Sequence, residues 1–290
     1  MSIRKATHSD REAIYKIWLS CFTDDQVYIN NYLDYCFPHT TTLIKEVSNS
    51  DAVAVISIIP SYFIHEKRIY SGAYLYGVGT LPEHRGKSYS SELISEAVSL
   101  LRAKGEEYFL VKPATESLFS LYRRLGFDKE LFKSISTLSH FPNTQYNQEI
   151  NIERIDPNAH IEEIATIREK KMSDKTFMWN RDVLNYALNE IVGRGGSVLF
   201  NRYTSDYCTG YQPETSSALH ILESTLAPDE TSAVFRNTIL STIPGTDEII
   251  LDSNYSSNQK GDKILSALLM ELKPGIFSFC KDLSLSLPME

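Results

Sequence analysis

The hydrophobic pattern of the first half of the chain alternates between the period of a helix and that of a strand. Apolar residues three or four positions apart predict helices with one buried face, at residues 9–22, 26–37, 88–104 and 115–125. β-Branched and aromatic runs predict strands, at residues 3–6, 43–47, 52–64, 69–80, 108–111 and from 127 onward. A helical crossover within a mostly antiparallel sheet predicts a mixed α/β fold whose sheet is flanked by helices.

The second half repeats this order in a weaker form. Helices are predicted at residues 161–170, 181–192, 230–243 and 261–272. Strands are predicted at residues 197–200, 208–211, 218–224 and 248–252. The repeated order predicts that the second half is a degenerate copy of the first.

Charge adds a boundary between the halves. The chain has 290 residues, enough for two domains. Residues 1–142 contain 16 basic and 16 acidic side chains, whereas the remainder contains 13 and 21 and carries the whole net charge of −8. Residues 143–149 are polar and lack aliphatic side chains, as linkers do. We therefore predict one domain at residues 1–142 and another at residues 150–290.

Composition excludes several classes of protein. An acidic chain is a poor match for nucleic acid, since phosphate neutralisation needs a basic surface. No apolar run approaches the roughly 20 residues that span a bilayer. The four cysteines lack CxxC spacing, which fits a reducing cytoplasm, and the seven histidines lack the spacing of metal ligands. A cytoplasmic protein without a metal is predicted.

The loop before the third predicted helix carries the clearest chemical signal. Free backbone N–H groups at a helix N-terminus attract phosphate, Gly86 permits close approach, and Arg85 and Lys87 add positive charge. The loop therefore predicts a phosphate or pyrophosphate site, with a solvated turn as the alternative. A P-loop would need glycine in place of Leu81, and a GxSxG nucleophile elbow would need glycine in place of Ser90.

Residues 78–87 resemble the acetyl-CoA-binding motif of the GCN5-related N-acetyltransferase (GNAT) superfamily, V-x-V-x-P-x-x-[RQ]-G-x-G-x-[GA]. Residues 77–86 are especially similar to the multi-domain branch that includes the enhanced-intracellular-survival aminoglycoside acetyltransferases. The resemblance covers about residues 1–140 and extends weakly to the second half, where that branch often carries a degenerate second acetyltransferase-like domain. Ser88 and Ser90 replace the second and third loop glycines of the family.

The resemblance implies an N-acetyltransferase that moves acetyl from acetyl-CoA to a primary amine by direct attack. The main chain of residues 78–80 would pair with pantetheine, and the amide of Thr80 would face the thioester carbonyl. The amides of residues 86–90 would hold the pyrophosphate. The implied donor-binding residues are Val78, Gly79, Thr80, Arg85, Gly86, Lys87, Ser88, Tyr89 and Ser90.

A second segment, residues 118–127, resembles the family's A-x-x-x-Y-x-x-x-G-F element. The resemblance gives Tyr122 the role of protonating the departing CoA thiolate, whereas its apolar neighbours alone would make it a core residue. The general base stays unassigned. Its candidates are Glu83, His84, Tyr74, Tyr76 and, if the chain folds back, Glu290.

The acceptor is expected to be the amine of a small molecule or peptide. The charge of −8 on the second half favours a cationic acceptor. Residues 225–231 of that half are acidic where the first half has its Arg-Gly loop, so the second domain is expected to bind no CoA. Two other functions remain open: an acyl-CoA-binding protein without turnover, and an aminoacyl-tRNA-dependent transferase with tandem GNAT-like domains.

Overall fold

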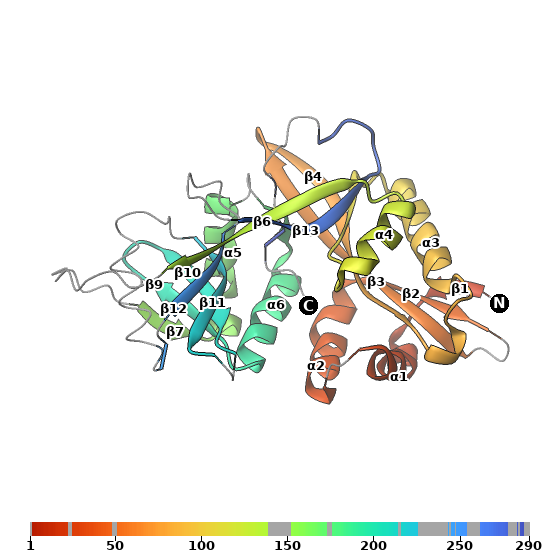
Figure 1. Cartoon of the computed structure of the whole chain (residues 1–290), viewed down its shortest axis with the longest axis horizontal. Coiled ribbons are helices and arrows are strands. Elements are labelled where there is room, and N and C mark those ends of the chain that lie inside the picture. Colours follow the sequence, from red (N-terminus) through yellow and green to blue (C-terminus); the bar gives the residue numbers. More distant parts are fainter. Residues whose placement is uncertain are drawn as a thin grey trace.

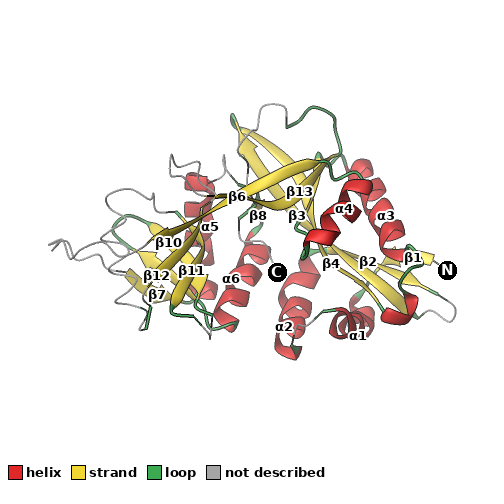
Figure 2. Ribbon diagram, viewed as in Figure 1, coloured by secondary structure: helices red, strands yellow, loops and turns green. Residues whose placement is uncertain are grey.

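A computed structural model describes most of the chain. The described residues are 2–22, 25–47, 51–138, 152–172, 176–213, 216–225, 243, 245–246, 248–253, 262–277, 283 and 285–286. Their strands form one 13-stranded sheet in the order β1-β2-β3-β4-β5-β13-β6-β12-β11-β10-β9-β7, with β8 paired to β3. Helices cover this sheet in both halves (Figures 1 and 2). The predicted α/β class, with a mostly antiparallel sheet flanked by helices, is confirmed.

The first half follows the predicted order of elements. It contains β1 (Ser2–Lys5), η1 (His8–Asp10), α1 (Arg11–Cys21), α2 (Gln26–Asn31), η2 (Tyr32–Cys36), η3 (Phe37–His39), β2 (Thr41–Glu46), β3 (Ala52–His65), β4 (Arg68–Thr80), η5 (Pro82–His84), α3 (Tyr89–Lys104), β5 (Tyr108–Val111), α4 (Glu116–Arg124) and β6 (Lys129–Leu138). The helix predicted at residues 26–37 is α-helical only in its first turns and continues as a π turn and a 3₁₀ turn.

The strands β4 and β5 separate in the middle of the sheet. They run parallel, and residues 72–75 of β4 pair with residues 108–111 of β5. The pairing ends there, although β4 continues to Thr80 and stays paired with β3 on its other side. The second part of β4 therefore has an edge that β5 does not cover.

The second half repeats the strand pairing of the first. It contains β7 (Ile152–Ile155), α5 (Pro157–Met172), β8 (Met178–Trp179), α6 (Arg181–Gly193), β9 (Ser197–Asn201), β10 (Asp206–Tyr211), β11 (Ala218–Ser224), β12 (Glu248–Ser253) and β13 (Asp262–Glu271). In the first half, β1, β2, β3 and β4 are antiparallel neighbours, and β4 pairs parallel with β5. In the second half, β7, β9, β10 and β11 are likewise antiparallel neighbours, and β11 pairs parallel with β12. This matching pattern confirms the degenerate second copy.

Each half contributes one strand to the other. β13, from near the end of the chain, lies between β5 and β6 and is antiparallel to both. β6 in turn continues from the first half into the second, where it pairs with β12. Figure 1 shows β6 crossing between the halves with β13, in blue, beside it.

The helix predicted at residues 261–272 is wrong, because residues 262–271 are the strand β13. Two other predictions, the linker at 143–149 and the helix at 230–243 up to its last residue, lie outside the described residues.

The two halves share one hydrophobic core. Phe177, from the second half, packs its ring 5.5 Å from Phe63 and 4.9 Å from Tyr108 of the first. Trp179 lies 5.5 Å from Tyr74, and α6 contacts α2. These rings are buried and fill the space between the halves, so Phe177 and Trp179 have an interface role.

The end of the described chain returns to the second half. Arg168 and Glu223 form a fully buried ion pair with 3.1 Å between Nε and Oε1. The hydroxyl of Ser286 donates to the same carboxylate, and its backbone N–H donates to Thr176 at 3.1 Å. The chain thus passes from the second half to the first through β13 and then back again.

Candidate active site

A pocket of about 160 Å³ lies where β4 and β5 separate. Its wall is largely aromatic, with contributions from α1, α2, β4, the end of β5 and α4. The lining residues are Trp18, Phe22, Tyr28, Tyr74, Leu75, Tyr76, Gly77, Val78, Val111, Lys112, Ala114, Leu118 and Tyr122.

The pocket joins the two faces of the sheet. Trp18, Tyr28 and Tyr76 belong to the core on the face covered by α1 and α2. Val78 and Tyr122 belong to the separate core on the face covered by α3 and α4. The pocket is therefore lined from both faces of the sheet, at the gap between the strands.

A bulge in β4 shapes one wall of the pocket. Gly79 pairs with Val55 and Tyr76 pairs with Ser57, so β4 has one residue more than β3 between these pairs. Gly77, within the bulge, has a φ of +57°, and a Cβ there would lie 2.5 Å from Cζ2 of Trp18. Only glycine fits this backbone conformation against the indole ring.

The three predicted donor-binding residues at the end of β4 have different surroundings. Val78 lines the pocket, whereas Gly79 packs against α1. A Cβ added at Gly79 would lie 3.1 Å from Cγ2 of Ile17. The carbonyl of Thr80 accepts hydrogen bonds from Sγ of Cys21 at 3.2 Å and from Nε of Arg85 at 3.1 Å. The guanidinium of Arg85 therefore braces the end of β4.

The predicted phosphate loop leaves several amides open. Gly86 and Ser88 have left-handed backbone conformations, with φ of +75° and +61°. Gly86, Lys87 and Ser88 are exposed residues. Their backbone N–H groups donate no hydrogen bond to any of the described residues. Ser88 is the N-cap of α3 without a side-chain capping bond, so it occupies a conformation that glycine favours.

The remaining loop side chains are held by neighbours. Nζ of Lys87 lies 3.5 Å from Nδ1 of His84. The ring of Tyr89 is buried, with Nζ of Lys45 5.4 Å from its centroid, and Ser90 is half-buried. Tyr89 is thus positioned to offer a ligand its backbone, while its ring anchors α3.

Tyr122 projects from α4 into the pocket. It is 5% exposed, and its ring packs edge-on against Phe127 with 5.8 Å between centroids. Burial raises the pKa of Tyr122 to about 12, so the phenol keeps its proton at neutral pH. None of the described residues forms a hydrogen bond with its hydroxyl, which leaves that group available to a bound molecule.

The candidates for the general base are not favoured by their surroundings. Tyr74 and Tyr76 line the pocket, but burial raises the pKa of both phenols well above the usual value. Tyr76 also hydrogen bonds to the hydroxyl of Tyr28 and, at 3.4 Å, to that of Tyr186. Glu83 and His84 do not line the pocket, and Glu290 is outside the described residues.

Lys112 is a pocket residue that the sequence motifs do not indicate. It follows the last residue of β5 directly, and burial lowers the pKa of its amine to about 8, with a further lowering from Lys133. The sequence does contain one indication of Lys112, because this charged residue comes directly after the fully buried strand β5.

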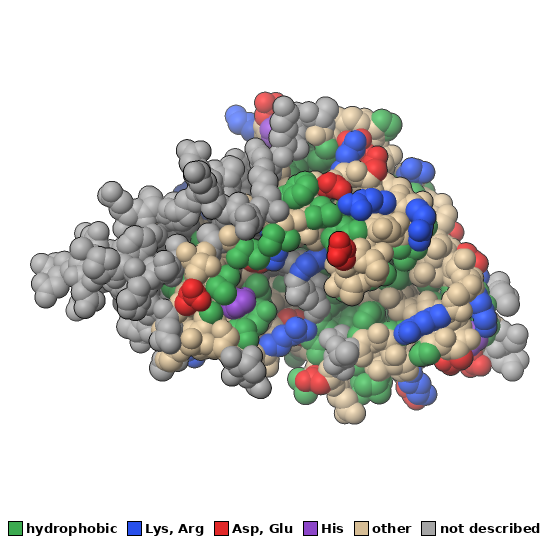
Figure 3. Space-filling model, in the orientation of Figure 1, with side chains coloured by type: hydrophobic (Ala, Val, Ile, Leu, Met, Phe, Trp, Pro, Cys, Tyr) green, Lys and Arg blue, Asp and Glu red, His purple; other side chains and the backbone are tan. Residues whose placement is uncertain are grey.

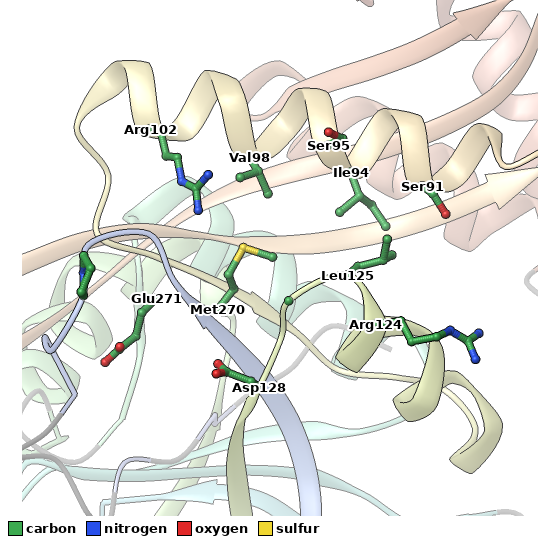
Figure 4. Close-up of a pocket in the computed structure, with 12 residues that line it drawn as sticks. Ser91, Ile94, Ser95, Val98, Arg102, Arg124, Leu125, Asp128, Met270 and Glu271 are labelled. Atoms are coloured by element: carbon green, nitrogen blue, oxygen red, sulfur yellow. The ribbon is translucent and has the colours of Figure 1, made fainter.

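A second cavity, of about 500 Å³, lies between α3, the end of α4 and β13. Figure 4 shows Ser91 and Arg102 at opposite ends of the helix that lines it, with Met270 between them. Arginines and carboxylates are both present. The lining residues are Ser91, Ile94, Ser95, Val98, Arg102, Arg124, Leu125, Gly126, Asp128, Met270, Glu271 and Pro274. None of these is a predicted site residue.

Neither a metal-binding cluster nor a membrane-spanning helix is present in the described part of the chain. It contains no group of three or more His, Cys, Asp or Glu side chains arranged to hold a metal ion. None of its helices combines the length and the apolar composition needed to cross a membrane.

Known proteins resemble this chain in sequence over its first part and in fold over most of its length. Residues 2–129 match the family model of the acetyltransferase (GNAT) domain. No curated protein matches the chain in sequence. Among solved structures, a protein of Enterococcus faecalis described as a probable N-acyltransferase superposes with a TM-score of 0.71 at 13% identity, covering 93% of this chain and 72% of that one.

Two further solved structures also superpose on this chain. Eis1 from Mycobacterium abscessus has a TM-score of 0.67 at 13% identity, over 94% of this chain and 74% of its own. A tandem GNAT protein from the clavulanic acid biosynthesis pathway has a TM-score of 0.56 at 10% identity, over 94% and 99%. At these identities the likeness concerns the fold. The family match identifies residues 2–129 as a GNAT acetyltransferase domain.

Proposed function

We propose that the protein transfers an acetyl group from acetyl-CoA to a primary amine by direct attack, in the pocket between β4 and β5. The observation that supports this proposal is the gap between these strands, which is lined by residues from the cores on both faces of the sheet, so that a donor and an acceptor would meet there from opposite faces. Tyr122 stands on the donor side, on the face covered by α3 and α4.

The donor would bind along the free edge of β4 and the loop that follows. Pantetheine carries two amides and can pair with the main chain of residues 78–80 as an added strand does. The exposed amides of Gly86, Lys87 and Ser88, with those of Tyr89 and Ser90 in the first turn of α3, suit a pyrophosphate. Arg85 and Lys87 add positive charge at this end.

The chemistry then needs two groups of the protein. A neutral amine attacks the thioester carbonyl, and a backbone amide near the end of β4, that of Val78 or of Thr80, stabilises the oxyanion. Tyr122, which is protonated at neutral pH, donates its proton to the sulfur as the carbon–sulfur bond breaks, and it recovers a proton from the amine nitrogen, directly or through water.

The acceptor would enter from the face covered by α1 and α2. The rings of Trp18, Tyr28 and Tyr76 suit the amine of a small molecule or of a peptide side chain, because aromatic faces attract cations before deprotonation. The net charge of −8 would draw a cationic acceptor at long range. We further propose that this reaction takes place in the cytoplasm, where Cys21 beside Thr80 stays reduced.

The test combines donor binding with turnover. Acetyl-CoA should bind in calorimetry, and free CoA thiol should appear when a panel of amines is added. Tyr122→Phe should bind the donor as well as the native protein does and lose about 100-fold in thiol release, because only the hydroxyl is removed. Tyr35→Phe, at an exposed position on η2, is the matched control and should change neither.

The outcomes separate the functions that the sequence leaves open. If calorimetry detects no binding of acetyl-CoA, the proposal is wrong. Binding without thiol release, in the native protein and the variant alike, would indicate an acyl-CoA-binding protein. On the face in Figure 3, Lys and Arg side chains of the described residues are interspersed with Asp and Glu, which gives no support to a tRNA-binding surface.

A further inference from the structure

Lys112 lies on the acceptor side of the gap between β4 and β5. Along β5, Tyr108 and Leu110 belong to the core on the α1–α2 face, whereas Phe109 and Val111 belong to the core on the α3–α4 face. Lys112 is the next residue, so the alternation of a strand directs it to the α1–α2 face. It lines the same pocket as the aromatic rings on that face.

Lys112 also lies where the pairing of β4 and β5 ends, which is where the proposed donor path begins. Val111 pairs with Leu75, and this is the last pair between the two strands. Lys112 follows this last pair on β5, the bulge at Gly77 and Val78 follows it on β4, and all three residues line the pocket. A pocket of about 160 Å³ has room for little more than the end of a donor chain and one amine.

We propose that Lys112 is a self-acetylation site: its side-chain amine takes the acetyl group from acetyl-CoA bound in this pocket, in place of an external acceptor. The inference rests on the proposed function, since the donor is the same acetyl-CoA. It adds a modification site whose product occupies the acceptor side and blocks it.

The surroundings of the amine favour a nucleophile. Among the described residues that line the pocket, Lys112 is the single amine, and the other titratable groups are the phenols of Tyr28, Tyr74, Tyr76 and Tyr122. The charged groups that act on it include Lys133 on β6, which lowers its pKa, and Asp252 on β12, which raises it, and these two pair with each other at 2.7 Å. With a pKa of about 8, a sizeable fraction of the amine is neutral at mildly alkaline pH.

The step balances without any further reactant. The lone pair of neutral Nζ attacks the thioester carbonyl carbon, and the tetrahedral intermediate collapses as the carbon–sulfur bond breaks. Tyr122 donates a proton to the leaving sulfur and recovers one from the nitrogen, directly or through water. The products are Nζ-acetyl-Lys112 and CoA thiol.

The experiment is peptide mass spectrometry of the full chain after incubation with acetyl-CoA and no added acceptor. The peptide that contains Lys112 should gain one acetyl group faster than the peptide that contains exposed Lys104. Its rate should rise about tenfold from about pH 7 to about pH 9 and level off, whereas an exposed lysine should rise about 100-fold.

Two controls distinguish transfer in the site from chemical reactivity. Acetyl phosphate lacks the CoA handle and should acetylate Lys104 at least as fast as Lys112. Tyr122→Phe should slow acetylation of Lys112 and leave Lys104 unchanged, and Lys112→Arg should remove the signal while keeping the positive charge.

Each outcome has a separate meaning. If the chain binds acetyl-CoA and acetylates amines while Lys112 reacts no faster than Lys104, the inference is wrong and the proposed function stands. If acetyl phosphate modifies Lys112 as selectively as acetyl-CoA does, the lysine is merely reactive and the inference is again wrong. If calorimetry shows that acetyl-CoA does not bind, the proposed function and the self-acetylation of Lys112 are both wrong.

Discussion

The conformation of single residues in β4 decides whether the pocket exists. Gly77→Ala should destabilise the protein by more than about 2 kcal/mol and abolish donor binding, because the new methyl group meets the buried ring of Trp18 and φ is left-handed. Gly86→Ala is the matched control. Gly86 is also left-handed, but a Cβ there has open space, so the cost should be about 1 kcal/mol.

Urea denaturation of the two variants measures this difference. Equal destabilisation would show that the indole does not lock the bulge, and that the left-handed backbone alone accounts for both losses.

Residues of the donor motif are predictable from sequence because they are contiguous. The loop from Arg85 to Ser88 and the position of Tyr122 each follow from spacing within one short segment. Trp18 and Lys112 are different, since they enter the pocket only when α1 packs on β4 and when β5 stops pairing. Such long-range packing leaves no local pattern, and sequence reasoning therefore finds Tyr74 and Tyr76 of the aromatic wall but misses Trp18 and the buried amine.

At the scale of elements, β13 shows why one helix prediction fails. Its residues Ile264 to Leu269 are mostly helix-forming leucine and alanine, and apolar positions fall three and four apart. A strand with neighbours on both sides and both faces covered has no need of alternation, so its apolar run is indistinguishable from that of a helix. The deciding fact is the gap between β5 and β6, which no local pattern records.

The burial of β13 gives a prediction for that strand. Leu268 is fully buried and pairs with Val111 of β5 and Glu130 of β6, so Leu268→Ala should cost about 2–5 kcal/mol. Ile264, in the same strand, is 41% exposed, and Ile264→Ala should cost less than about 1 kcal/mol.

Thermal unfolding followed by circular dichroism compares these two variants. The Leu268 variant should also bind acetyl-CoA more weakly, since β5 positions the wall of the pocket. A Leu268 variant as stable as the Ile264 variant would mean that β13 contributes little to the first half.

At the scale of the whole molecule, the exchange of β6 and β13 joins the two halves into one folding unit. The central strands of the sheet come from both halves of the sequence, and the shared core places Phe177 against Phe63 and Tyr108. The charge boundary near residue 142 thus separates two copies of one fold along the chain without separating two independent structures in space.

A fragment of residues 1–142 tests this conclusion. It contains the whole donor loop and Tyr122 but lacks β13, so β5 and β6 would each expose an unpaired edge in the middle of the sheet. We expect it to unfold without a cooperative transition and to bind no acetyl-CoA, whereas the full chain should unfold in a single transition. Mixing it with a fragment of residues 150–290 should restore both properties, because β13 can then pair with β5 and β6. If the fragment of residues 1–142 alone unfolds cooperatively and binds the donor, the exchanged strand is dispensable, and the acetyltransferase half is a domain in its own right.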